Sequence, residues 1–512
     1  MPGSFTGMPR RAFPGPAGNF PPGLGALPPA GGQESHLPAR THNQTEEINM
    51  TGINTLLEKK GVAKAGKAVY LALLLLFTAA FVHPDLMETA NHSYLLLDSI
   101  FSGRFFDFYT DVLAHVNGLY YINAAHYNIA AYIMFAVWEL PVWLINRILS
   151  LPVNEPALWL WTKLLCAGLL FACAWQMDRL VTASLGDRDT SQKAAWLFLL
   201  SPIPFLLAAF GFYDLPAIFL MLAALCCYVK DDMKGFCLLM GCSALFKIFA
   251  MLLFVPLLLL ARKKLLREWI PLGVLAVLPY GFTSLLFLGR TGDVNDFMDL
   301  IIRRFFEFGV GFIPLLATSI AVLSVWCYLR PAPQTPDARL RAAASCGLTV
   351  FGAVLLFMIW HPQWAIFIFP FYVLTAVTQR NRQMYELLNP ALSGCILLYT
   401  YTCYPNQLEA NMLVWGAGYF IRGGALLDLA EMPPVLTLMA RYLPTTALSM
   451  AFAAVLVCVI VFRFDAGSGK PLADRNVTEE QPISLPRAAL GFALVIAFYL
   501  CCLMLSLFVI NR

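Results

Sequence analysis

Charged residues are scarce in this sequence. Only 13% of its 512 residues are Asp, Glu, Lys or Arg, whereas 59% are hydrophobic. Soluble domains carry about 25% charged and about 45–50% apolar residues, so the composition excludes an ordinary soluble domain and predicts a polytopic membrane protein. The formal net charge of +4 is too small to indicate nucleic acid as a partner.

The motifs of several enzyme classes are also missing. The sequence has no glycine-rich phosphate loop and no Ser/His/Asp arrangement, so nothing indicates a nucleotide-driven reaction. Most of the 13 cysteines lie inside apolar runs, without the spacing of metal ligands. We therefore expect small core residues rather than a disulfide framework or a metal site.

The first 65 residues differ from the rest of the chain. They are rich in Pro and Gly and then polar, with no apolar periodicity, which predicts a disordered tail over residues 1–65. The first long apolar run starts near Ala68 and lacks the cleavage site of a signal peptide. We expect this run to be the first span, and residues 66–512 to form one transmembrane domain.

Apolar runs of about 17–25 residues, the length that crosses a bilayer, mark the rest of the chain. They predict an all-α membrane protein with about 13 transmembrane helices. The expected spans are 67–83, 157–177, 193–210, 213–229, 235–246, 249–261, 270–289, 310–329, 341–360, 364–379, 391–404, 444–463 and 487–510. Lys and Arg in the connecting loops fit one alternation, with a cytoplasmic N-terminus.

Two segments need separate interpretation. The apolar segment 128–148 contains Glu139 and Pro141, and a full crossing there would reverse every later basic loop, so we expect an interfacial or re-entrant helix. It would belong to a large outer loop, residues 84–156, whose amphipathic helices lie on the membrane with their charges solvated. The run between Lys234 and Arg262 is interrupted by Lys247 and predicts a hairpin of two short helices.

Acidic groups follow the first span directly. Asp85 and Glu88 are three residues apart, which places them on one face of a helical continuation, close to His83. A carboxylate there could accept a proton from an incoming hydroxyl, so both are candidate catalytic residues. The alternative is a solvated start to the outer loop.

Two further charges lie next to apolar segments. Asp214 follows a Gly-Phe-Tyr sequence between two spans, where it either needs a partner or caps the next helix. A buried Lys247 would cost at least about 2.5–3.5 kcal/mol, which an anionic ligand such as a lipid phosphate would offset. Snorkelling to an interface is the alternative.

Aromatic and amide groups gather at a later turn. His361, Gln363 and Trp364 could line a sugar site, because flat rings stack on sugar faces and amides bond hydroxyls; an aromatic belt at the membrane surface is the alternative. His126 in the outer loop is a further candidate. The amphipathic piece 296–308, with Arg303 and Arg304, favours interfacial anchoring over attraction of phosphate groups.

Taken in order, these features resemble the GT-C superfamily of membrane glycosyltransferases, and most closely the family of the GPI mannosyltransferase I catalytic subunit with its bacterial relatives. The resemblance covers roughly the first 375 residues. It rests on Asp85 after the first span, the Gly-Arg segment within 95–109, Ser-Pro at 201–202 followed by the turn at Asp214, Phe-Lys-Ile-Phe at 246–249, and Pro-Gln-Trp at 362–364. The family's Asp-x-Asp motif is here Asp-Leu-Met-Glu, with Glu88 one position further on.

The resemblance implies an inverting transfer of a hexose, most simply mannose, from a polyprenyl-phosphate donor on the outer side of the membrane. It implies Asp85 as general base and Lys247 at the donor phosphate, and it leaves open whether a divalent cation takes part. The acceptor could be a glycolipid, a cell-wall polymer or a protein. The membrane would be the plasma membrane of a bacterium or the endoplasmic reticulum of a eukaryote.

Two other classes stay open. A transporter or lipid flippase would use charges near the middle of the membrane, although no internal repeat is visible. A non-catalytic scaffold could bind partners through its Pro-rich tail, but it would not require Lys247 or Asp214.

Overall fold

The computed structural model describes residues 60–115, 125–290, 292–403, 444–463, 474 and 479–510. Most of these residues are helical, which confirms the all-α class; the strands of the described part form one small hairpin, and the rest are loops and turns. Most of the expected tail lies outside the described residues. Its last positions, from Lys60, already belong to the first described helix.

The helices follow the expected apolar runs closely. Their bounds are α2 Lys60–Ala80, α3 Pro84–Phe101, η1 Phe105–Asp107, α4 Phe108–Ala114, α5 Ile129–Ile148, α6 Glu155–Leu185, α7 Arg188–Leu199, α8 Pro202–Phe210, α9 Leu215–Val229, α10 Met233–Phe246, α11 Ala250–Ala261, η2 Leu265–Trp269, α12 Ile270–Leu286, α13 Gly292–Glu307, β1 Gly309–Val310, β2 Ile313–Pro314, α14 Leu315–Leu329, α15 Pro336–Phe357, η3 Pro362–Phe367, α16 Ile368–Thr378, α17 Arg382–Cys403, α21 Thr445–Val461 and α22 Leu485–Ile510.

Local sequence signals explain where these helices begin and end. Side chains of Asn128, Asn154 and Asp187 accept hydrogen bonds from the first turns of α5, α6 and α7, which satisfies amides that a helix start leaves unpaired. Gly186 and Gly211 follow α6 and α8 in the left-handed conformation, the usual end of a helix.

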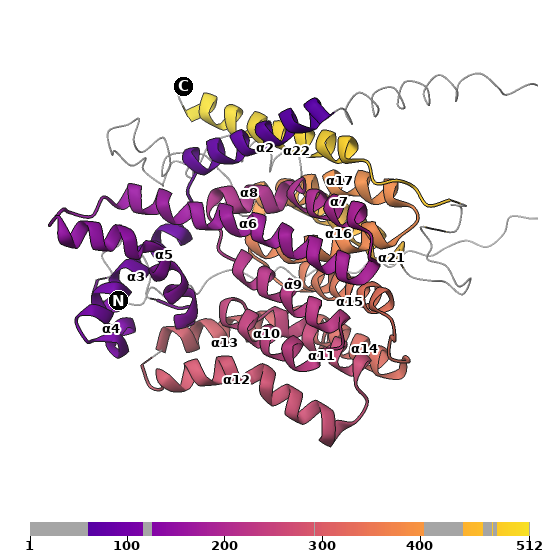
Figure 1. The fold of residues 1–512 in the computed structure, drawn as a ribbon, viewed down its shortest axis with the longest axis horizontal. Helices are drawn as coiled ribbons and strands as arrows, with labels where there is room; N and C mark the ends of the chain where they lie inside the picture. The colour runs from indigo at the N-terminus through magenta and orange to yellow at the C-terminus, as the bar shows by residue number, and fades with distance from the viewer. Residues whose placement is uncertain are drawn as a thin grey trace, which may run out of the picture. The chain divides into compact units, whose positions relative to one another are not determined.

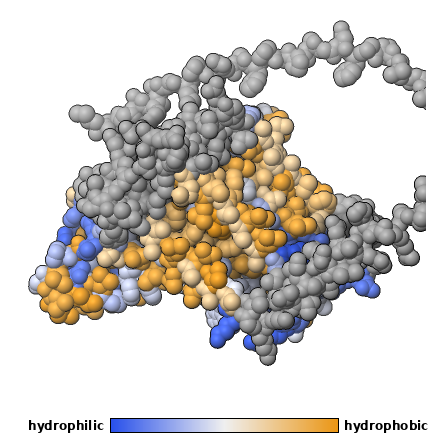
Figure 2. Space-filling view, turned by 90° about the horizontal axis from the view of Figure 1, so that it is seen from above, coloured by the Kyte–Doolittle hydropathy of each residue, from blue (hydrophilic) through white to orange (hydrophobic). Residues whose placement is uncertain are grey.

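Of the expectation of about 13 transmembrane helices, only the coarser part is confirmed: several helices are able to cross a membrane by their length and composition. In the described residues five helices are long and apolar enough to cross a membrane, or up to seven if each of two bent pairs is one span. The bent pairs are α2 with α3, at 75°, and α7 with α8, at 56°. The other expected spans form shorter apolar helices, such as α9, α10 and α11. Figure 2 shows a face on which apolar side chains predominate, as a hydrocarbon environment requires.

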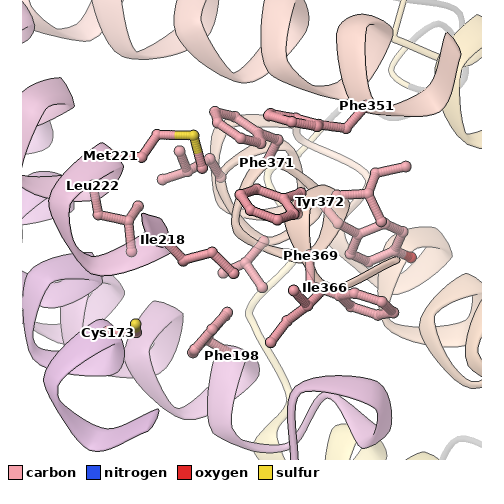
Figure 3. Packing of buried hydrophobic residues seen from close by; sticks show 14 of the residues in the cluster. Cys173, Phe198, Ile218, Met221, Leu222, Phe351, Ile366, Phe369, Phe371 and Tyr372 are labelled. Carbon is pink, nitrogen blue, oxygen red and sulfur yellow. The ribbon is translucent and has the colours of Figure 1, made fainter. Parts of the chain in front are cut away.

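The core is built around α16. All residues of this helix are buried, and Figure 3 shows its aromatic side chains packed among residues of α6, α7, α9 and α15. Gly347 of α15 allows the close approach, because a Cβ there would lie 2.0 Å from the ring of Phe371. In Figure 1 the first and last described helices, α2 and α22, lie together, and Tyr70 and Phe492 join them with ring centroids 5.8 Å apart.

The segment expected to be an outer loop differs most from its prediction. Most residues of α3 are buried, including Glu88, while Asp85 and Asp98 remain partly exposed. The reason is that α5 packs along α3 and covers it. By length and composition α5 is itself able to cross a membrane. Its Glu139, expected at the headgroup level, is fully buried and accepts a hydrogen bond of 2.6 Å from Thr162 of α6.

Candidate functional site

The break between α2 and α3 positions Asp85. Pro84 occupies the first turn of α3, and the Nδ1 atom of His83 accepts a hydrogen bond of 3.2 Å from the amide of Asp85. The same Nδ1 atom lies 3.5 Å from the Asp85 carboxylate. The His83 side chain is 2% exposed and that of Asp85 37% exposed. The imidazole therefore caps the first turn of α3 through the Asp85 amide, and the carboxylate beside it can be reached by solvent and a ligand.

Glu88 has a different environment from Asp85, although both lie on one helix, α3, which follows the first helix after a break and a bend of 75°. Its side chain is buried and interacts electrostatically with Tyr132 of α5. Asp85 instead interacts electrostatically with Tyr127, Asp214 and His361. The two carboxylates are therefore not equivalent, and Asp85 is the one that belongs to the cluster described next.

Asp214 and Lys247 form a buried ion pair. Asp214 lies in the turn between α8 and α9, and Lys247 lies at the break between the short helices α10 and α11, where the sequence predicted an interruption. The Lys247 Nζ and Asp214 Oδ1 atoms are 3.5 Å apart, and the two side chains are 6% and 2% exposed. Asp214 occupies the N-cap position of α9, but its side chain makes no capping hydrogen bond. The positive charge of Lys247 is thus compensated by Asp214 within the protein, whereas the sequence suggested an anionic ligand or snorkelling to an interface.

Gly211 brings these parts together. Its φ of +93° is a conformation that favours glycine, and a Cβ there would lie 2.4 Å from Cδ2 of Leu86. Lys163 of α6 packs on the same turn, and its Nζ atom donates a hydrogen bond to the Thr78 carbonyl of α2. The turn that carries Asp214 can therefore approach the first turn of α3, which carries Asp85.

Two tyrosines surround the ammonium of Lys247. Its Nζ atom lies 4.6 Å from the ring centroid of Tyr127 and 5.3 Å from that of Tyr213, distances at which an aromatic face attracts a cation. Burial, with a smaller contribution from the charge of Asp85, raises the pKa of the Tyr127 phenol well above its ordinary value. Tyr127 is therefore neutral at physiological pH. Sequence reasoning did not select Tyr213, although its place beside Asp214 was a signal.

The expected turn at 360–364 enters the same region. Trp364 is 3% exposed, and the ring centroids of Trp364 and Phe249 are 4.7 Å apart. In the described structure its Nε1 atom is buried without a hydrogen-bond partner. Gln363 is also buried. The alternative of an aromatic belt at the membrane surface is therefore wrong for this indole, because η3 carries it into the core.

His361 and Arg304 lie beside Trp364. The rings of His361 and Trp364 are 5.5 Å apart, and the Arg304 guanidinium is 5.9 Å from the Trp364 ring. Burial, with the positive charge of Arg304, lowers the pKa of His361 to about 4. The imidazole is therefore neutral at physiological pH. Anchoring at the interface does not account for Arg304, whose guanidinium faces the core.

A cavity of about 40 Å³ joins these groups. Its lining is His126, Tyr127, Asn128, Ala244, Leu245, Phe246, Lys247, Ile248, Phe249, Tyr280, Met298, Ile301 and Trp364. The candidates His126, Lys247 and Trp364, which are far apart in sequence, thus share one cavity. Its volume is sufficient for ordered water. It presents a cation and an unsatisfied indole N–H, which are donors suited to an anionic or hydroxylated ligand.

The described residues contain no group of three or more His, Cys, Asp or Glu side chains arranged to hold a metal ion. No residue is therefore assigned to a divalent cation. Comparison of the chain with known protein families, with curated proteins and with solved structures finds no match.

Proposed function

We propose that this chain is a membrane glycosyltransferase of the GT-C type. It would move a hexose, with mannose as the first sugar to test, from a polyprenyl-phosphate donor to an acceptor on the outer side of the membrane. One observation carries the proposal: the exposed carboxylate of Asp85 interacts electrostatically with a buried ion pair beside a cavity with aromatic walls. The five to seven helices able to cross a membrane suit a lipid-linked substrate.

The proposed chemistry is a single displacement. The acceptor oxygen attacks the anomeric carbon, the bond from that carbon to the phosphate oxygen breaks, and the phosphate leaves with the electron pair. Asp85 accepts the proton of the acceptor hydroxyl, and its exposure allows that contact. Lys247 stabilises the charge that develops on the leaving phosphate. The rings of Tyr127 and Trp364, with the imidazole of His361, offer faces and polar edges to the sugar.

Asp85 is a better base than Asp214 for a geometric reason. The Asp214 side chain is 2% exposed and is held beside Lys247, so an acceptor hydroxyl would have to displace the ion pair to reach it. Glu88 is also buried. Of these three, only Asp85 combines exposure with an electrostatic interaction with Tyr127 and His361.

A transporter or lipid flippase is the second candidate, and buried charges inside candidate spans favour it. Glu139 of α5 and Lys163 of α6 are fully buried, and charges at such depth often mark a transport path. Both already have protein partners, Thr162 and the Thr78 carbonyl. These bonds account for Lys163 and for Oε1 of Glu139, whereas Oε2 of Glu139 is buried without a hydrogen-bond partner in the described structure.

The deciding experiment is sugar transfer by purified protein in detergent. Labelled polyprenyl-phosphate mannose serves as donor and a membrane-lipid extract as acceptor, with Asp85→Asn beside wild type. Asp337→Asn is the matched control, because Asp337 is also a half-exposed carboxylate and it pairs with Arg341.

We expect Asp85→Asn to bind donor but to lose at least about 100-fold in turnover, since a positioned base contributes about 10²–10⁴-fold. Asp337→Asn should match wild type. Equal turnover in all three proteins would remove Asp85 from the mechanism. Absence of transfer with several sugar donors, together with lipid movement across vesicles, would favour the transporter.

A further inference from the structure

Helix α13 forms one wall of the cavity. Met298 and Ile301 line it, and Arg304, one turn after Ile301, extends toward Trp364. Phe305 packs against the main core. The spacing of these residues places them on one side of the helix. α13 therefore holds a cation at the edge of the site through contacts made by only one of its faces.

The opposite side of α13 is exposed and divided into two stripes. Ile302 and Phe306, four residues apart, are 51% and 54% exposed. Asp299, Arg303 and Glu307, also at intervals of four, form the neighbouring charged stripe and are exposed. An amphipathic helix with adjacent apolar and charged stripes suits the boundary between hydrocarbon and water.

The hairpin after α13 carries the most exposed aromatic side chain in the described residues. Val310 of β1 pairs with Ile313 of β2, and Gly311 makes the turn with φ +63°. Phe312 at the tip is 96% exposed, and Val310 is 69% exposed. Such a tip would be costly in water, since burying a Phe side chain is worth about 1.5–3 kcal/mol.

Lipid is the covering that the neighbouring helix indicates. α14 begins directly after the hairpin, and its outward residues Val322, Val325 and Leu329 are 63%, 58% and 75% exposed. The apolar tip is therefore continuous along the chain with an apolar helix surface. One medium, the hydrocarbon edge of a bilayer, covers both.

We propose that α13 and the β1–β2 hairpin form a membrane-seated arm: the tip at Phe312 inserts into the bilayer and so holds Arg304 at the cavity. The partner of this surface is a phospholipid bilayer. The arm would be needed by any reaction or transport that uses the cavity, so the inference goes beyond the proposed glycosyl transfer.

The occupant of the tip is tested by photo-crosslinking. The full chain is placed in nanodiscs of phosphatidylcholine and phosphatidylglycerol, with benzoylphenylalanine at position 312 or, as a control, at the exposed loop position of Gln334. Irradiation should attach phospholipid at 312 and not at 334. No lipid adduct at 312, or an adduct with a second copy of the chain, would overturn the proposal.

The link from tip to site is tested by deuterium exchange of residues 298–314 in the same nanodiscs. We expect Phe312→Ser to speed exchange about tenfold, because the lost insertion is worth about one decade in an equilibrium constant. Phe312→Trp should restore slow exchange, and Leu329→Ser, on the apolar surface outside the arm, should leave it slow. Equal exchange in all four proteins would show that the tip does not hold the arm. Neither readout measures sugar transfer, so a failure here is separate from a failure of the proposed function.

Discussion

Two buried polar regions of this molecule differ in how completely their hydrogen bonds are made. In the first, Arg463 donates to Thr378 Oγ1 at 3.2 Å, to the Arg341 carbonyl at 2.6 Å and to Ser345 Oγ. Asp474 accepts from two backbone amides of the turn between α16 and α17, both at 2.9 Å. This region, the tie, connects the chain after α21 to α15 and α16.

The second region is the cavity cluster. In the described structure neither carboxylate oxygen of Asp214 has a hydrogen-bond partner, and the same holds for Nε1 of Trp364. The buried N–H of Trp364 costs about 1–3 kcal/mol when it has no partner, whereas Lys247, 3.5 Å away, already offsets the charge of Asp214. The tie is therefore held by several hydrogen bonds, whereas the cavity cluster is held by one ion pair and by aromatic contacts.

The largest expected effect concerns the ion pair. Lys247→Met should lower the free energy of unfolding by about 3–5 kcal/mol, because it leaves Asp214 buried and unpaired. The double variant Lys247→Met with Asp214→Leu should recover most of this loss while donor binding stays absent. Thermal unfolding in detergent measures the stability of each variant, and a binding assay with the donor measures its affinity. A double variant less stable than the single one would show that the pair itself holds the fold.

The tie should behave in the opposite way. Arg463→Met leaves several buried acceptors unsatisfied, so we expect a loss of about 2–3 kcal/mol in unfolding free energy. Donor binding and transfer, measured well below the melting temperature, should be unchanged. Lost transfer in a folded Arg463→Met protein would contradict the division between the two regions.

The third effect depends on pH and on His361. Its pKa is lowered from 6.5 to about 4 in the folded protein, so the unfolded chain binds more protons between these values. The stabilising contribution is complete above pH 6.5 and is lost as pH falls toward 4. Lowering pH from 7 to 5 should destabilise wild type by about 2 kcal/mol more than His361→Gln. If wild type and His361→Gln lose the same stability between pH 7 and pH 5 in thermal unfolding, the folded protein does not hold the His361 imidazole neutral.

The smallest effect separates two tryptophans of equal burial. Trp360 and Trp364 are each 3% exposed, but Nε1 of Trp360 donates to the Leu355 carbonyl at 3.0 Å. Trp360→Phe should therefore cost about 1 kcal/mol more in unfolding free energy than Trp364→Phe, whose lost N–H had no partner. Only Trp364→Phe should weaken donor binding. Equal stability losses would indicate that the Trp364 N–H is satisfied.

Much of the helix pattern could be predicted from the sequence, because apolar runs, prolines and capping residues act locally. The break at Lys247, between two short helices, is an example. Tertiary packing was harder to predict from the sequence. Whether 128–148 lies on a surface or against α3 depends on contacts between residues distant in sequence, and the same is true of the short helices expected to be full spans.

The sequence predicted which residues belong to the site but not which of them pair with one another. Asp85, Asp214, Lys247, His361 and Trp364 stood out because charges and polar rings are unusual in apolar sequence. The pairing of Asp214 with Lys247, and the approach of Arg304 to Trp364, join separate helices, and no local pattern encodes them. Gln363 is buried, and its role as a sugar ligand stays a prediction.

The ion pair also has a consequence for biosynthesis. Asp214 and Lys247 stand at the same end of a helical hairpin, α9 and α10, which are neighbours in sequence and pack along each other. Each charge alone would oppose entry into the bilayer by about 2.5–3.5 kcal/mol. A hairpin that inserts as one unit would carry a neutralised pair, so the ion pair can form before Tyr280, Met298, Ile301 and Trp364, the later residues of the cavity lining, are synthesised.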